Sequence, residues 1–187
     1  GQKAATFRSF PFVDVDDQAH VVRIRPGAWT IDRDLVIPSG YTVEALAPLK
    51  LSLSKGTELV SRSPLQWTGT DEMPILVTSP DSSSLGVHVI EAIGQSRLDN
   101  VHFTGLMRYT YDQVRPAELS FHRSNVSLEH CRFTGTSATL VDLSLGEAQL
   151  RSCTFAGASD QLELHFVRAQ VSGTRFEGAK DDAISVE

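Results

Sequence analysis

The chain has little cysteine, no long apolar run and no excess of basic residues, and each shortage excludes a class of protein. Two cysteines in 187 residues are too few for a disulfide framework or a cysteine metal cluster. No apolar stretch approaches the length of a membrane span, so we expect no membrane insertion. With 17 Lys and Arg against 23 Asp and Glu, the net charge is −6. This balance argues against a surface for nucleic acid or anionic lipid.

Helical periodicity and short catalytic motifs are missing as well. No stretch of useful length places apolar residues at the three- to four-residue spacing of an amphipathic helix. There is no metal-binding histidine spacing, no Gly-x-Ser-x-Gly and no phosphate-binding loop. No local motif therefore names an activity, and the information must lie in a longer-range pattern.

That pattern is a repeated Phe-x-Gly. The phenylalanines are Phe103, Phe133, Phe155 and Phe176, spaced by 30, 22 and 21 residues. Trp67-Thr68-Gly69 reads as an earlier copy with another aromatic residue. An apolar residue stands five positions before each phenylalanine, and a short segment of alternating apolar and polar residues follows each glycine. Period-2 alternation is typical of strands.

A unit of about 21 residues built from short strands predicts an all-β fold, a right-handed parallel β-helix of about seven coils. Stacking the coils would make one continuous core, and the phenylalanines would form a ladder at roughly 4.8 Å per rung. A β-sandwich is the rival, but it predicts no fixed Phe-x-Gly column. We expect residues 1–20 to be an N-terminal cap or leading segment. Residues 21–187 would be the β-helix, truncated or continued at its C-terminal end.

The repeat V-x-L-x-x-C-x-F-x-G and its degenerate copies, over roughly residues 60–187, resemble the pectin-lyase-like β-helix superfamily. The segment RPGAWTIDRDLVIPSGYTVEA, residues 25–45, is similar to entry coils of β-helical segments beside spore-coat-H-like kinase domains in bacterial surface proteins. The resemblance implies a bacterial, extracytoplasmic protein, on a fold that hosts both polysaccharide-active enzymes and non-enzymatic scaffolds. Of the polygalacturonase-like site only Asp181-Asp182 has a counterpart. The Gly-His-Gly and Arg-Ile-Lys motifs are absent.

Carboxylates recur at one outward position of the strand that follows each Phe-x-Gly. The predicted column contains Glu118, Asp142, Glu163 and Ala183. The neighbouring outward column contains Ser120, Ser144, His165 and Ser185. Carboxylates one strand spacing apart repel unless a cation or a substrate lies among them. Glu118, Asp142, Glu163 and His165 are therefore the candidate catalytic residues of an acid/base site.

The same column has a simpler interpretation, a solvated acidic face with side chains that splay apart in water, and the sequence favours it. We assign no metal ligands and no cofactor. Ca²⁺ is the one ion that the column could take, because hard cations prefer clustered carboxylate oxygens. The missing fourth carboxylate, at Ala183, predicts weak Ca²⁺ binding or none.

The longest coil carries about eight extra residues, in LMRYTYDQVRPAE at 106–118. Insertions in a solenoid map to a loop on one face, which is often the binding face. The candidate substrate-binding residues of this loop are Arg108, Tyr109, Tyr111, Asp112 and Arg115. Tyrosine rings can stack on sugars and arginine can bind carboxylates. The alternative is a surface flap whose tyrosines cover the core.

Cys131 and Cys153 occupy one inward column, one coil apart. Stacked residues at strand spacing lie within the range of a disulfide, but a free cysteine is also a good small buried side chain, which is the interpretation we favour.

The leading functional expectation is a non-enzymatic scaffold or recognition module that presents a surface to carbohydrate or to a protein partner. The first alternative is a polysaccharide-active enzyme (lyase, hydrolase or epimerase) with an acidic groove on one sheet. The second is a segment of a trimeric spike or adhesin, which would carry an apolar stripe on its exterior. A homo-oligomer partner, or the rest of a longer chain, is expected to cover the C-terminal coil.

Overall fold

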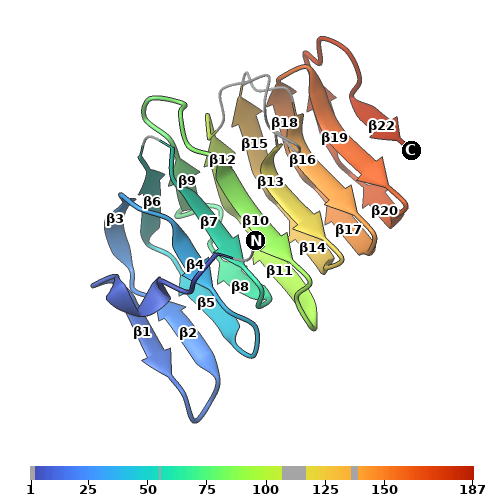
Figure 1. The fold of residues 1–187 in the computed structure, drawn as a ribbon. Coiled ribbons are helices and arrows are strands. Elements are labelled where there is room, and N and C mark those ends of the chain that lie inside the picture. Colours follow the sequence, from blue (N-terminus) through green and yellow to red (C-terminus); the bar gives the residue numbers. More distant parts are fainter. Residues whose placement is uncertain (1–2, 55, 107–116, 136–138) are drawn as a thin grey trace.

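The structure is a computed structural model that describes residues 3–54, 56–106, 117–135 and 139–187. Regular structure in these residues is almost entirely β, and the one helix is the 3₁₀ turn η1 (Phe7–Ser9). This turn is far too short to cross a membrane, and no other described helix exists that could do so. The strands form three sheets that wind into a solenoid of about seven turns (Figure 1).

Each turn contributes one strand to each of the three sheets in succession, named A, B and C here. Sheet A contains β1 (Val13–Asp16), β2 (Val21–Ile24), β5 (Thr42–Leu46), β8 (Leu65–Thr68), β11 (Gln95–Asp99), β14 (Asn125–Glu129), β17 (Glu147–Arg151) and β20 (Arg168–Ser172). Sheet B contains β3 (Gly27–Ile31), β6 (Leu49–Leu53), β9 (Ile75–Thr78), β12 (Val101–Thr104), β15 (Arg132–Gly135), β18 (Thr154–Gly157) and β21 (Arg175–Glu177). Sheet C contains β4 (Leu35–Ile37), β7 (Glu58–Ser61), β10 (Gly86–Ile90), β13 (Ala117–His122), β16 (Thr139–Ser144), β19 (Asp160–His165) and β22 (Ile184–Val186).

Neighbouring strands within the solenoid are parallel. Strand β14, for example, pairs with β11 on one side and β17 on the other, with Leu128 opposite Leu98 and Leu150. The exception is β1, which pairs antiparallel with β2 at the edge of sheet A. The all-β parallel β-helix predicted from the repeat is therefore confirmed. Strands on all three sheets alternate apolar residues inward and polar residues outward, which is why a repeat of low sequence identity builds one core.

The phenylalanines of the repeat form the predicted ladder. Phe103, Phe133, Phe155 and Phe176 are register partners on sheet B. Successive ring centroids are 5.3, 4.8 and 4.9 Å apart, and the rings stack with interplanar angles of 9°, 22° and 16°. Three of the four are fully buried. Stacked aromatic rings at strand spacing add to the area that each ring buries, so this column is a main source of stability.

The proposed earlier copy of the repeat, Trp67-Thr68-Gly69, is wrong. Trp67 lies on sheet A opposite Leu98, and not in the phenylalanine column. The position below Phe103 in that column is filled by Val77. The reason is the corner that follows β8: residues 69–74 separate it from β9, where Asn100 alone separates β11 from β12. Extra residues at a corner move a motif from one sheet to another.

Two of the corners repeat with the same backbone conformation in successive coils. Between sheets C and A, Glu91, Arg123, Leu145 and Phe166 all have φ between 48° and 58°. Between sheets A and B, the left-handed residues are Asn100, His130, Ser152 and Gly173. A single left-handed residue turns the chain sharply and places it in the next sheet. These two corners therefore hold sheet A in a fixed position relative to its two neighbours.

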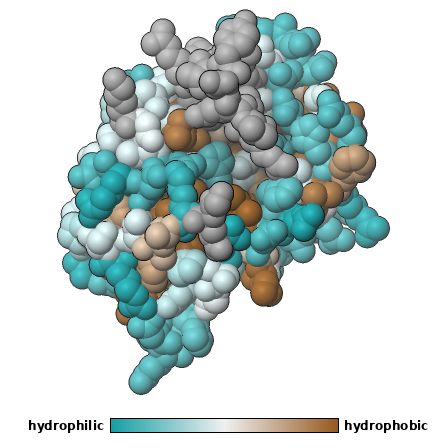
Figure 2. Space-filling model, in the orientation of Figure 1, coloured by the Kyte–Doolittle hydropathy of each residue, from teal (hydrophilic) through white to brown (hydrophobic). Residues whose placement is uncertain are grey.

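The N-terminal segment lies against the first coils. Phe7, Phe10 and Phe12 are buried and belong to the hydrophobic core. Backbone hydrogen bonds join Thr6 N to Val36 O and Arg25 N to Phe12 O. The side visible in Figure 2 is mainly hydrophilic, with hydrophobic side chains in separated patches.

Both cysteines are free and buried. Burial raises the pKa of the Cys131 thiol well above its ordinary value, which makes this thiol a poor nucleophile. Of the two interpretations of this pair, the structure shows the free, buried one.

Candidate functional site

The outer face of sheet C carries two columns of polar side chains that run along the solenoid. In the first column the register partners are His88, Ser120, Asp142, Glu163 and Ser185. In the second they are His122, Ser144 and His165. The first column contains two carboxylates on neighbouring strands, β16 and β19, and the second places His165 beside them.

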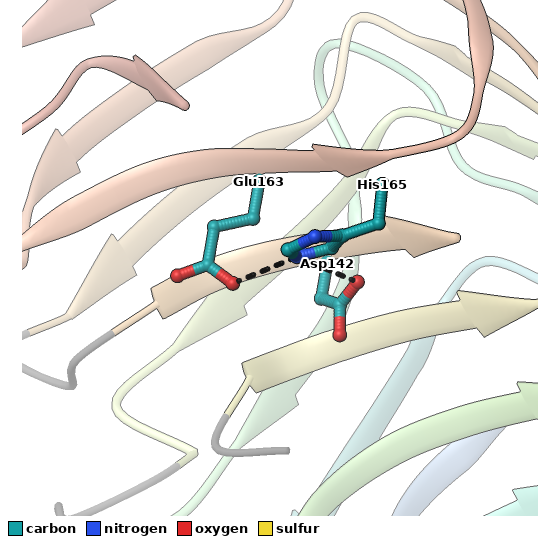
Figure 3. A group of neighbouring side chains, drawn as sticks. All are labelled: Asp142, Glu163 and His165. Atoms are coloured by element: carbon teal, nitrogen blue, oxygen red, sulfur yellow. Dashed lines mark hydrogen bonds and ion pairs between the residues drawn. The ribbon is translucent and has the colours of Figure 1, made fainter. Parts of the chain in front are cut away.

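Asp142, Glu163 and His165 converge, and we call them the sheet C cluster. One ligand atom from each lies within 4.8 Å of the others. His165 Nε2 lies 3.4 Å from Glu163 Oε2 and 4.0 Å from Asp142 Oδ1. Figure 3 shows the imidazole between the two carboxylates, with Glu163 and His165 on one strand and Asp142 on the next. The structure thus brings together three of the four predicted catalytic residues.

Further polar groups fix the orientation of these side chains. Thr139 Oγ1 donates a hydrogen bond of 2.7 Å to Glu163 Oε1. His165 Nδ1 lies 3.3 Å from Glu187 Oε2, so both ring nitrogens of His165 face a carboxylate. The two carboxylates of the cluster differ in access: 8% of the Asp142 side chain is exposed, against 26% for Glu163. Only Glu163 and His165 offer a usable surface to a ligand.

The fourth predicted residue, Glu118, lies elsewhere. Strand β13 pairs Leu119 with Val141 and Ser120 with Asp142, so Glu118 lies two residues before the position that joins the carboxylate column. Its side chain is fully buried. Ala183 is displaced in the same way, because Ser185 is the partner of Glu163. The predicted column of Glu118, Asp142, Glu163 and Ala183 is therefore wrong at both ends.

The error is a shift of two residues. The predicted columns placed Ser120 beside Ser144, whereas Ser120 pairs with Asp142 and His122 pairs with Ser144. Leu145 is a corner residue with φ 58° and does not belong to the strand. Since side chains alternate with period 2, a two-residue shift keeps every outward residue outward and changes only its neighbours.

His88, which belongs to no sequence motif, lies in the first column on β10, two strands away from Asp142. Leu85 O can only accept, so His88 Nε2 donates to it at 2.7 Å, and Nδ1 accepts from the Ser120 hydroxyl at 2.7 Å. Burial lowers the pKa of His88, and the negative charges of Glu58 and Asp142 offset this in part. The sequence gives no sign of this contact, because the Phe-x-Gly repeat begins at Phe103 and sets no register for β10, the strand of His88.

The predicted substrate-binding residues of the long loop fall outside the part of the chain that the structure describes. They are Arg108, Tyr109, Tyr111, Asp112 and Arg115. Their assignment as substrate-binding residues stays a prediction.

One nitrogen and two carboxylates are a ligand set for a divalent transition metal rather than for Ca²⁺, which takes six to eight oxygens. Asp142, Glu163 and His165 are the described residues that could hold such an ion. Without a metal, the same atoms provide hydrogen-bond acceptors and one imidazole donor to a polar ligand.

Comparison with protein-family models, with curated proteins and with solved structures gave no match.

Proposed function

We propose that the protein is a non-enzymatic recognition module that binds carbohydrate on the outer face of sheet C. The observation that carries this proposal is the convergence of Glu163 and His165, both part-exposed, beside the nearly buried Asp142. Sugar hydroxyls both donate and accept hydrogen bonds, so a carboxylate and an imidazole side by side suit them. We also propose that the protein is a pectin-lyase-like β-helix and that it acts outside the cytoplasm.

A polysaccharide-active enzyme is the second candidate, and one observation favours it. The oxygens of Asp142 and Glu163 lie within 4.8 Å, near the ~5–5.5 Å of retaining glycosidases and short of the ~6.5–9.5 Å of inverting ones. A nucleophilic carboxylate must reach the sugar, however, and only 8% of the Asp142 side chain is exposed. The burial of Asp142 therefore favours binding without turnover.

The spike or adhesin alternative receives less support. It requires an apolar exterior stripe, whereas the side seen in Figure 2 is mainly hydrophilic.

A screen against neutral and acidic polysaccharides tests the proposal by reading both retention and new reducing ends. We expect retention without turnover, weakened about tenfold in Glu163→Gln or His165→Ala, the loss of one or two hydrogen bonds. The matched control is Glu177→Gln, an exposed carboxylate on sheet B. Turnover that disappears in Glu163→Gln would establish the enzyme instead. No retention of any polysaccharide would refute both carbohydrate functions.

A further inference from the structure

A groove crosses the outer face of sheet A, on a different side of the solenoid from the sheet C cluster. Its volume is about 520 Å³. Polar side chains from four successive strands, β8, β11, β14 and β17, line it, and the main ones are Gln66, Arg97, Asp99, Ser127, Glu129, Gln149 and Arg151. No motif or resemblance in the sequence predicts a binding site on this face.

The lining residues form two straight columns along the solenoid. Arg97 is the register partner of Gln66 and of Ser127, and Ser127 is the partner of Gln149. In the second column, Thr68, Asp99, Glu129 and Arg151 are partners in that order. Each strand advances the columns by about 4.8 Å. The groove therefore offers polar groups at regular steps over roughly 14 Å, which suits an extended chain with polar groups along its length.

The charges in the groove balance. Arg97 and Arg151 contribute +2, and Asp99 and Glu129 contribute −2, so the charged lining residues sum to zero. Asp99 is also paired with His130, whose Nδ1 lies 3.0 Å from Asp99 Oδ1. A polyanion would meet Asp99 and Glu129, and a polycation would meet Arg97 and Arg151. Each charged ligand would therefore be repelled by two like charges in the groove, whereas an uncharged ligand is repelled by none.

Several hydrogen-bonding groups of the groove are available to a ligand, although Gln149 Oε1 accepts from Arg151 Nη2 at 3.4 Å and Asp99 Oδ1 accepts from Asn100 Nδ2 at 3.0 Å. Among the residues that the structure describes, none makes a hydrogen bond or ion pair with the side chains of Arg97 or Ser127. Gln66 donates to the Gln95 carbonyl at 2.7 Å, which fixes its amide and leaves its Oε1 as an acceptor. Guanidinium donors, amides, a hydroxyl and carboxylate acceptors together match a ligand whose groups both donate and accept.

The groove does not suit a flat apolar ligand, because Trp67, the one aromatic residue among its described lining residues, is not exposed. Trp67 is fully buried beneath the groove, so its ring is not available for stacking. A flat apolar ligand would find no aromatic surface among the described lining residues.

We infer that this groove is a second glycan site, and that it binds an extended neutral oligosaccharide along the solenoid axis with about one sugar ring per strand. Arg97, Ser127 and Gln149 would contact the sugar hydroxyls from three successive strands. The inference rests on the proposed function only in taking carbohydrate as the ligand class, and it concerns a separate surface.

The test uses the full chain, labelled with ¹⁵N, and a panel of neutral hexasaccharides derived from cellulose, xylan, mannan and chitin. We expect at least one member to shift the amide signals of β11, β14 and β17. Arg97→Ala and Gln149→Leu should each weaken its binding about tenfold, the loss of one hydrogen bond in a desolvated contact. Arg132→Ala, an exposed arginine on sheet B, is the matched control and should leave the affinity unchanged.

Three results would overturn the inference: no binding by any member of the panel, shifts confined to sheet C, or a tenfold loss of affinity between 50 and 500 mM NaCl, which would indicate a charged ligand. The two sites are separated by their variants. Glu163→Gln should spare the groove, and Arg97→Ala should spare the sheet C cluster. Either proposal can therefore fail alone.

Discussion

Individual residues on this solenoid are constrained by the rungs above and below them, and Gly135 shows how tightly. A methyl group at Gly135 would collide with the buried carboxylate of Glu118. Glu118 comes from the preceding rung of sheet C, so a backbone position on one sheet depends on a side chain from another.

Gly135→Ala should therefore lower the free energy of unfolding by about 1–3 kcal/mol, because the new methyl group overpacks a filled site. The measurement is urea denaturation followed by circular dichroism. In a Glu118→Ala background the same substitution should cost less than about 1 kcal/mol, since its collision partner is gone. Equal costs in the two backgrounds would show that the carboxylate is not the obstacle.

His88 gives the stability of the protein a dependence on pH. Burial lowers its pKa in the folded state, so the unfolded chain binds the proton more readily. The contribution of neutral His88 is fully present above its unfolded pKa of about 6.5. It is lost as the pH falls through the folded value.

Unfolding free energies of wild type and His88→Gln, measured at pH 7.5 and at several lower values, should converge as the pH falls below about 6.5. A glutamine can keep one of the two hydrogen bonds without taking up a proton. A constant difference between the two proteins across this range would mean that His88 does not titrate on unfolding.

At the scale of the strands, inward positions could be predicted from the sequence and outward register could not. The columns of Leu128 and Phe133 were predicted correctly because apolar side chains at period 2 must face the core. Glu163 was predicted correctly as the partner of Asp142 on β19, but its partner on β13 is Ser120 and not Glu118. The corners before sheet C differ in length, because β13 begins twelve residues after Gly105 and β16 begins four residues after Gly135. Outward side chains carry no signal that would reveal such a difference.

The phenylalanine ladder supplies an element-scale prediction with a matched control. Phe133→Ala removes a fully buried ring that stacks on two others, and should cost about 3–5 kcal/mol. Phe166→Ala removes a ring that is 80% exposed at a corner, and should change stability by less than about 0.5 kcal/mol. Thermal and urea unfolding would measure both. Similar losses would mean that the corner ring packs as the ladder does.

The sheet C cluster leads to a prediction about Ca²⁺. The expected column of three carboxylates contains two, with His165 beside them, and this set is poor in oxygen ligands. Calorimetric titration with Ca²⁺ should therefore show no site of micromolar affinity. A micromolar site that disappears in Glu163→Gln would contradict this prediction.

Along the whole molecule, the apolar side chains of different coils are buried to different degrees. Leu128 and Leu150 in the central coils are fully buried, whereas Val171 and Ile184 in the last coil are 38% and 41% exposed. Each coil of a solenoid is stabilised mainly by its neighbours, so a coil with less burial opens at lower free energy.

Hydrogen exchange of the native protein should therefore be fastest in β20, β21 and β22, and slowest in β11 to β17. Phe133→Ala should accelerate exchange in the central coils, because it weakens both of its interfaces. Uniform protection along the chain would indicate that the solenoid opens as a single unit and not coil by coil.

The repeated left-handed corners between sheets C, A and B have a consequence for the size of the two polar faces. Every coil turns at those corners in the same way and adds one strand to each sheet, so a coil is a unit of length. Duplicating residues 147–167, from the start of β17 to the corner after β19, would lengthen the sheet A groove by about 4.8 Å. All other strand pairs would keep their register. The number of repeats would thus determine how long a ligand the proposed groove can span, independently of the chemistry that would hold the ligand.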